Sequence, residues 1–265
     1  MAEPVRHLPF AQEPDEDDSG RPVLLRLVER SDGRLEMVEM PLTPELFLYP
    51  QLEDNILQKE PHGLIRGALT DLLRRHFAPE SLVLEDVQHD FDVPGVPPTG
   101  PDISVTLRAK PGERTSFFVR DEGVRPDLII EVLSPDSAAI RKVDEVDKVA
   151  IYERAAIPEY LIVDLPRRAN QRRFRLKGYR LDRQGRYQPI EPDAQGRLFC
   201  KATRLWFTVS VEGDRVLVFD QRTGERLLYS EEEEAGRKAA EAENSRLRKE
   251  LERLKRSLES RTKED

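Results

Sequence analysis

The sequence predicts an α/β or α+β fold in which helices flank a mixed β-sheet. Residues 62–77 place apolar side chains on one face of a helix and charged side chains on the other. Residues 81–134 contain three apolar or β-branched runs typical of strands. A second helix, over residues 143–156, then precedes the buried-looking strand EYLIVDL. The order helix, strands, helix, strand is typical of a sheet with helices on its faces.

Composition excludes several classes of protein. Charged residues make up 35% of the 265 residues, against about 25% in average domains, so part of the chain should be solvated. Cys200 is the single cysteine, which excludes disulfides within the chain and multi-cysteine zinc sites. Neither a secretory signal nor a run of apolar residues long enough for a membrane span is present, and a reducing, cytoplasmic setting fits. The net charge of −8 excludes a uniformly basic surface for nucleic acid but permits a local basic patch.

Three regions follow from composition and turn signals. Residues 1–22 are rich in proline and acids and predict a disordered arm. Residues 23–229 predict a folded domain that opens with a hairpin around an SDGR turn and ends, from residue 172, in a β-meander. Within this domain, residues 44–77 follow the hairpin and are helical in pattern, with breaks at Pro50 and Pro61. Residues 230–265 predict a charged helix.

This C-terminal helix carries leucines at coiled-coil spacing. The four leucines are separated by four, three and four residues, and Asn244 holds the preceding position of the same seam. They are Leu247, Leu251, Leu254 and Leu258. A coiled coil, giving a homodimer, and a lone helix held by pairs of opposite charge both fit this pattern.

Glu131 is the first candidate for chemistry. It lies inside PDLIIEVLSPD, a run of Leu, Ile and Val that should be buried on both sides of a strand. Burying a carboxylate is costly unless it is paired with or bound to a cation. A salt bridge to an arginine, or a strand end open to solvent, would satisfy Glu131 without any function.

A second carboxylate, Asp102, opens a similar strand. PDISV repeats the Pro-Asp-apolar beginning of PDLII, so the two strands could lie side by side and bring Asp102 near Glu131. Two converging carboxylates repel unless one is protonated or a cation lies between them. Mg²⁺ takes one or two carboxylates and leaves positions for phosphate oxygens.

Lys148, on the helix over 143–156, is the third candidate. It follows Asp144 by four residues and precedes Tyr152 by four, an order that suits a helical pair of opposite charge. At the edge of the buried face its ammonium could reach a metal-bound water or a phosphate. An ordinary surface ion pair is the alternative.

Together these residues resemble a known family. The string PDLIIEVLSPDS, followed by a D-x-x-x-K-x-x-x-Y pattern in DEVDKVAIYERAAIPEYLIVD, closely resembles the Uma-two family of nucleases with the PD-(D/E)xK restriction-endonuclease fold. The resemblance is strong over about residues 62–164. It is loose over the β-rich extension and the leucine-bearing tail.

The resemblance implies a restriction-endonuclease-like core within residues 23–229. It also implies that Asp102 and Glu131, with the backbone carbonyl of Val132, bind the metal. The chain departs from the simple motif at Leu133, where the lysine would stand, and Lys148 is the substitute that the resemblance offers. Asp127 is a rival for the first acidic position, although it lies four positions before Glu131, a span of roughly 13 Å along a strand. His62, at the start of the first helix, is a further candidate near the metal or an ordinary helix N-terminal residue.

The implied activity is that of a Mg²⁺- or Mn²⁺-dependent endodeoxyribonuclease, a hydrolase acting on the phosphodiester bonds of DNA. The stretch from Arg167 to Arg186 interleaves basic and aromatic residues and predicts a phosphate-contacting ribbon. A solvated hairpin with alternating arginines fits it equally well. The basic residues proposed to contact DNA are Arg167, Arg168, Arg172, Arg173, Arg175 and Lys177. A non-catalytic module that binds nucleic acid or protein on the same fold is the alternative function.

Overall fold

The computed structural model describes residues 23–48, 54–56, 60–133, 141–165 and 173–261. The chain divides into two compact units, Met1–Leu57 and Gln58–Asp265. None of the helices in the described part is long and apolar enough to cross a membrane.

The first unit is built on an antiparallel hairpin. Strand β1 (Val23–Glu29) pairs with β2 (Leu35–Pro41) and, on its other side, with β3 (Asp54–Ile56). Gly33 adopts a positive φ of 78° in the connecting turn, a conformation that glycine enters without steric cost. The short helix α1 (Pro44–Leu48) follows β2. The hairpin predicted around the SDGR turn is confirmed.

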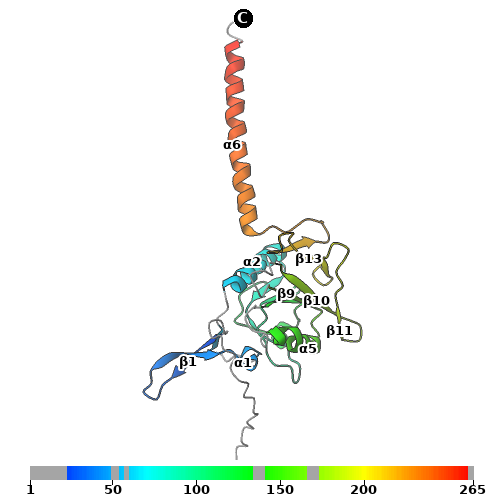
Figure 1. Cartoon of the computed structure of the whole chain (residues 1–265). Helices are drawn as coiled ribbons and strands as arrows, with labels where there is room; N and C mark the ends of the chain where they lie inside the picture. Colours follow the sequence, from blue (N-terminus) through cyan, green and yellow to red (C-terminus); the bar gives the residue numbers. More distant parts are fainter. Residues whose placement is uncertain (1–22, 49–53, 57–59, 134–140, 166–172, 262–265) are drawn as a thin grey trace, which may run out of the picture. The chain divides into compact units, whose positions relative to one another are not determined.

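The second unit is organised by a six-stranded mixed sheet in the order β11-β10-β9-β8-β6-β4 (Figure 1). Only β8 and β9 run parallel, and the other neighbours are antiparallel. All six residues of β8 and of β9 are buried, as expected for central strands rich in Leu, Ile and Val. The strands are β4 (Leu82–Glu85), β6 (Ile103–Thr106), β8 (Leu128–Leu133), β9 (Glu159–Asp164), β10 (Arg175–Leu181) and β11 (Tyr187–Pro189).

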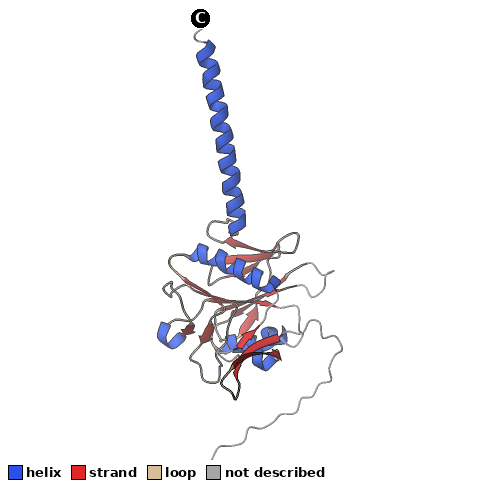
Figure 2. Cartoon of the chain, turned by 90° about the vertical axis from the view of Figure 1, so that its left-hand side faces the viewer, coloured by secondary structure: helices blue, strands red, loops and turns tan. Residues whose placement is uncertain are grey.

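Helices cover both faces of this sheet (Figure 2). Helix α2 (Glu60–Phe77) packs its leucines against Ile130 and Val132, on one face of β8. A π-helical turn, η1 (Val143–Asp147), continues into α5 (Lys148–Arg154) and covers the opposite face, where Tyr152 packs against Tyr160. Since side chains alternate along a strand, Glu131 points to the η1–α5 side. The predicted α+β core with a mixed sheet is confirmed.

The predicted β-meander divides between two sheets. Strands β10 and β11 extend the central sheet, whereas β12 (Leu198–Cys200), β13 (Leu205–Val209) and β14 (Val216–Asp220) form a separate antiparallel sheet. Glu159 connects the two sheets: it is buried, pairs with Arg180 at 2.7 Å and accepts hydrogen bonds from the amides of Lys201 and Ala202.

A two-stranded parallel pair completes the unit. It consists of β5 (Gln88–Asp90) and β7 (Ser116–Phe118), and α3 (Val119–Glu122) follows β7 directly. His89 of β5 is buried and stacks on Phe117 with ring centroids 4.8 Å apart.

The C-terminal helix α6 (Ser230–Arg261) begins beside α2. Ser230 hydrogen-bonds Asp71, and Glu233 pairs with Arg75 at 2.8 Å. Glu232 accepts a hydrogen bond from the amide of Tyr229, which satisfies one of the donors at the helix start.

We expect His89 to make stability depend on pH. Burial lowers its pKa to about 4, so between pH 6.5 and 4 the unfolded chain binds a proton that the folded chain does not. The free energy of unfolding should therefore fall as pH drops below 6.5, by roughly 3 kcal/mol at the lower end. Urea unfolding at pH 7.5, 6 and 5 should show a smaller loss for His89→Gln than for the parent. Equal losses would contradict this role of His89.

Candidate active site

The register of β6 against β8 brings Asp102 beside Glu131. Ile103 lies opposite Ile130 in an antiparallel pair, so the residue before β6 meets the residue after Ile130. The amide of Asp102 lies 3.4 Å from Glu131 Oε2, and Asp102 Oδ2 accepts a hydrogen bond of 2.7 Å from the amide of Val132. The two Pro-Asp strands thus lie side by side, as predicted. They are antiparallel, so the start of β6 lies beside the C-terminal half of β8.

Lys148 approaches the same carboxylates from the helical side. Its Nζ lies 2.9 Å from Glu131 Oε1 and 2.9 Å from Asp144 Oδ1. Lys148 is the first residue of α5 and Asp144 lies in the π-helical turn before it. The wider turn carries Asp144 and Lys148 to the buried face together, and such turns occur frequently at functional sites.

Two buried tyrosines hold this group of charges in place. The hydroxyl of Tyr152 donates a hydrogen bond of 2.8 Å to Glu131 Oε1. The hydroxyl of Tyr160 donates one of 3.0 Å to the backbone carbonyl of Asp144. Both rings are fully buried, so Glu131 and the η1 turn have little freedom to reorient.

Helix α2 supplies the opposite side of Asp102. His62 Nε2 lies 3.2 Å from Asp102 Oδ2, and Arg66 Nη1 lies 3.5 Å from Asp102 Oδ1. Arg66 also pairs with Glu85 at 3.1 Å and Asp86 at 3.2 Å. His62 and Arg66 are one helical turn apart, which places both on the side of α2 that faces Asp102.

The buried charges shift one another's pKa values. Burial raises the pKa of Glu131 well above its usual value, opposed by Lys148 and reinforced by Asp102 and Asp144. Burial alone would raise the pKa of Asp102 as well, but His62, Lys148 and the Val132 amide lower it to about 2. Burial lowers the pKa of Lys148, and the two carboxylates in contact with it outweigh that effect and raise it.

The charge balance leaves room for one more positive charge. Lys148 is shared by Glu131 and Asp144, so one ammonium faces two buried carboxylates. A proton on Glu131 or an additional cation would restore the balance. Asp102 and Glu131, two acids with oxygen donors, are neighbours on paired strands here and suit a hard divalent cation.

Within the part of the chain that the structure describes, no three His, Cys, Asp or Glu side chains form a complete metal cage. Mg²⁺ does not require one, since it is commonly bound by one or two carboxylates together with water and substrate phosphates. The residues present therefore fit such an ion in donor type and charge.

Asp127 is not part of the cluster. Its Oδ2 accepts a hydrogen bond of 2.8 Å from the amide of Leu107, at the other end of the β6–β8 pair. The Val132 backbone, by contrast, lies beside both Asp102 and His62. Its amide donates a hydrogen bond to Asp102, and a backbone hydrogen bond with His62 raises the pKa of that histidine. Of the secondary candidates, His62 joins the cluster and Asp127 does not.

A second polar group lies on the same face of the sheet, beside the cluster. Arg141 Nη2 binds Asp164 Oδ1 at 2.5 Å, and Glu145 pairs with Lys177 at 2.6 Å. Arg141 is 3% exposed, and its Nε and Nη1 have no hydrogen-bond partner among the described residues.

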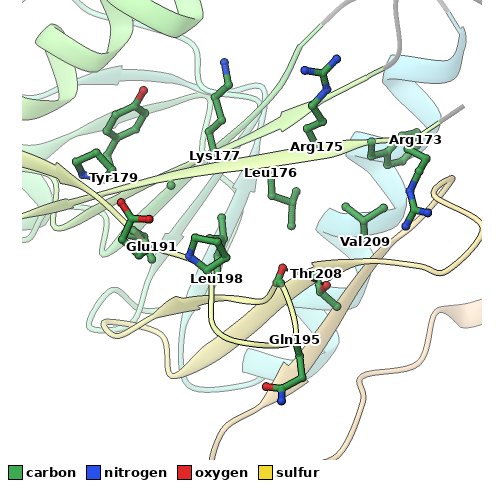
Figure 3. A pocket seen from close by; sticks show the side chains of 16 residues that line it. Arg173, Arg175, Leu176, Lys177, Tyr179, Glu191, Gln195, Leu198, Thr208 and Val209 are labelled. Atoms are coloured by element: carbon green, nitrogen blue, oxygen red, sulfur yellow. Dashed lines mark hydrogen bonds between the residues drawn. The ribbon is translucent and has the colours of Figure 1, made fainter. Parts of the chain in front are cut away.

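The predicted basic ribbon falls partly on β10. Lys177 and Arg175 are exposed, and Figure 3 shows them projecting from the side of the strand opposite to Leu176. A groove of about 590 Å³ lies along β10, between Arg173 and the loop that contains Glu191 and Gln195. Three of the predicted contact residues, Arg167, Arg168 and Arg172, lie outside the described residues.

Several residues of the cluster were not predicted as site residues. Asp144 and Tyr152 were recognised only as helical neighbours of Lys148, and Arg66 only as part of the polar face of its helix. Arg141 carried one usable signal: with Glu145 and Lys148 it repeats at four and then three residues, which is a charged helical stripe. Such a stripe next to a strongly apolar strand could have indicated a buried charged face.

The mixed sheet flanked by helices is consistent with a restriction-endonuclease-like fold. Residues 49–212 match the Uma2 family, whose description reads "Putative restriction endonuclease". The match covers more than half of the chain, and the chain belongs to this family. It includes β10 to β13 in addition to the core strands. No curated protein matches the sequence.

We expect Lys148→Met to be strongly destabilising. It would leave Glu131 and Asp144 buried without their shared cation, a change that costs about 3–5 kcal/mol for a broken buried pair. Lys177→Met is the matched control, because its partially exposed pair with Glu145 should contribute less than about 1 kcal/mol. Urea unfolding of both variants measures the difference. Equal losses would show that the Lys148 pair is not a main support of the fold.

Proposed function

We propose that this Uma2 protein is a metal-dependent endodeoxyribonuclease. The observation that carries the proposal is the convergence of Asp102, just before β6, and Lys148, from α5, on Glu131 of β8: the amide of Asp102 and the ammonium of Lys148 each lie within 3.4 Å of its carboxylate. A structural salt bridge needs one acid and one base. Here a second strand contributes another acid beside Glu131, and a pair of neighbouring acids is what a cation-dependent hydrolase requires.

Asp102, Glu131 and the Val132 carbonyl would hold the ion, Mg²⁺ or Mn²⁺. When bound, such an ion lowers the pKa of a coordinated water and neutralises charge on a phosphate. The residues of the chain do the rest. Tyr152 fixes the orientation of Glu131 through its hydrogen bond. Lys148 remains an ammonium because two carboxylates raise its pKa, so it orients the attacking water and stabilises the negative charge that develops.

Access to these groups requires a movement. The side chains of Asp102, Glu131 and Lys148 are only 8%, 3% and 4% exposed. A phosphate can reach them only after a covering group is displaced. His62 lies against Asp102 and is our candidate for that group.

The strand register indicates where DNA would lie relative to Glu131. Glu131, Ile162 and Lys177 lie opposite one another across β8, β9 and β10, and Arg175 is one row further along the same face. Because neighbouring strands are about 4.8 Å apart, the strand of Lys177 lies about 10 Å from that of Glu131. Phosphates next to the cleaved bond would therefore contact Lys177 and Arg175.

We expect Glu131→Gln to abolish cleavage and retain the fold. The amide keeps the shape of the side chain and removes the charge that would bind the ion. The measurement is cleavage of single-stranded, duplex and branched DNA with Mg²⁺ or Mn²⁺, and Glu145→Gln serves as the acidic control outside the cluster. Cleavage by Glu131→Gln at the parental rate would refute the site.

A metal titration separates this function from the alternative of a non-catalytic module. Stabilisation by a bound ion follows RT ln(1 + [L]/Kd). The melting temperature of the parent should rise with Mn²⁺ or Mg²⁺, and that of Glu131→Gln should rise less. A parent that binds DNA but shows neither cleavage nor metal-linked stabilisation would support the binding module.

We expect Arg175→Ala to weaken DNA binding equally for all sequences. Loss of one phosphate contact should lower the slope of log K against log salt concentration by about 1. Fluorescence anisotropy with a labelled duplex, in the Glu131→Gln background, measures this slope. Arg222→Ala, which removes an exposed arginine from the turn after β14, is the control. An unchanged slope for Arg175→Ala would contradict a contact between β10 and the DNA phosphates.

A further inference from the structure

Helix α6 has an apolar seam without a partner in the described part of the chain. Every described residue from Glu233 to Arg253 is exposed, including Leu247 and Leu251, which are 52% and 54% exposed. In sequence, Leu254 and Leu258 extend the same seam. Most of the stability of a helix in a protein comes from packing its apolar face, and these leucines have no such packing within the described residues.

The charged residues that flank the seam indicate which kind of partner helix fits it. With Asn244, Leu251 and Leu258 at position a of a heptad and Leu247 and Leu254 at position d, the flanking g positions are Glu243 and Glu250, and the flanking e positions are Arg248 and Lys255. In a parallel, in-register pair, each g residue faces the e residue five positions later on the other helix. Glu243 then faces Arg248, and Glu250 faces Lys255, twice each by symmetry.

We propose that α6 pairs with α6 of a second copy of this chain as a parallel, in-register coiled coil. An antiparallel pair would set g against g and e against e, which places glutamate against glutamate and arginine or lysine against its like. Such pairs repel. The helix carries nine acidic and nine basic side chains, so its two copies meet without net repulsion.

Asn244 supports the same arrangement. It lies at an a position, where one polar residue fixes register and orientation at a cost in stability. In the parallel pair Asn244 meets its own copy, and the two amides can hydrogen-bond each other. In an antiparallel pair or a shifted register each Asn244 would face an apolar residue and lose that partner.

Oxidative cross-linking of the full chain tests the orientation. The single native thiol, Cys200, is buried and gives a clean background. The variant Asn244→Cys should form a disulfide-linked dimer, because the two a positions meet at the symmetry axis. The variant Lys249→Cys, with its thiol at the outward f position, should form at least tenfold less. Cross-linking of Lys249→Cys as efficient as that of Asn244→Cys would overturn the parallel register.

Charge variants test the pairing itself by light scattering. The parent should have twice its mass of 30.6 kDa. Glu243→Lys with Glu250→Lys should be monomeric, whereas Glu252→Lys with Glu259→Lys, which changes the charge equally away from the seam, should remain a dimer. Mixing the first variant with Arg248→Glu plus Lys255→Glu should restore a dimer of the two chains. A monomeric parent at about 100 μM, or a dimer that survives the first variant, would overturn the proposal.

Discussion

The rest of the structure depends on the contact between Glu131 and Lys148 in the interior of the protein. Moving an unpaired, ionised carboxylate into an apolar sheet is costly, so Glu131 requires either a proton of its own or a cation at short range. Lys148 meets this need at 2.9 Å and brings Asp144 with it. The contact fixes how the η1–α5 segment packs on the sheet, because the ammonium, the Tyr152 hydroxyl and the Tyr160 hydroxyl all lie on one buried face.

The register of the strands places the other residues of the candidate site around Glu131. The antiparallel pairing of β6 with β8 delivers Asp102 to Glu131, and the parallel pairing of β8 with β9 aligns Glu131 with Ile162 and then with Lys177. A slip of one residue in either pair would turn the side chains to the other face. The buried apolar residues of β8 and β9 resist such a slip, so the hydrophobic core and the charged cluster specify the same register.

The sequence was sufficient for the parts of the fold and site that depend on local pattern. The β8 run marked Glu131 as a buried acid, and the repeated Pro-Asp marked Asp102. Neither run indicates whether β6 and β8 are parallel or antiparallel, because side chains alternate between the two faces of a strand in the same way in both arrangements. Joining β10 and β11 to the central sheet depends on contacts between distant residues, such as Glu159 with Arg180. Asp144 lies within a π-helical turn that no composition signal marks, so its burial could not be predicted.

The composition of the cluster is unfavourable for stability, which supports the catalytic function that we propose. Replacing a buried ion pair by apolar residues is often neutral or stabilising, so a pair kept only for folding confers no advantage. A third acid, Asp144, makes the arrangement more costly, because the charges of Asp102 and Asp144 raise the pKa of Glu131, and the charge of Asp102 raises the pKa of Asp144. In the function that we propose, a divalent cation held by Asp102 and Glu131 beside Lys148 would complete the arrangement and would bring a phosphate to it.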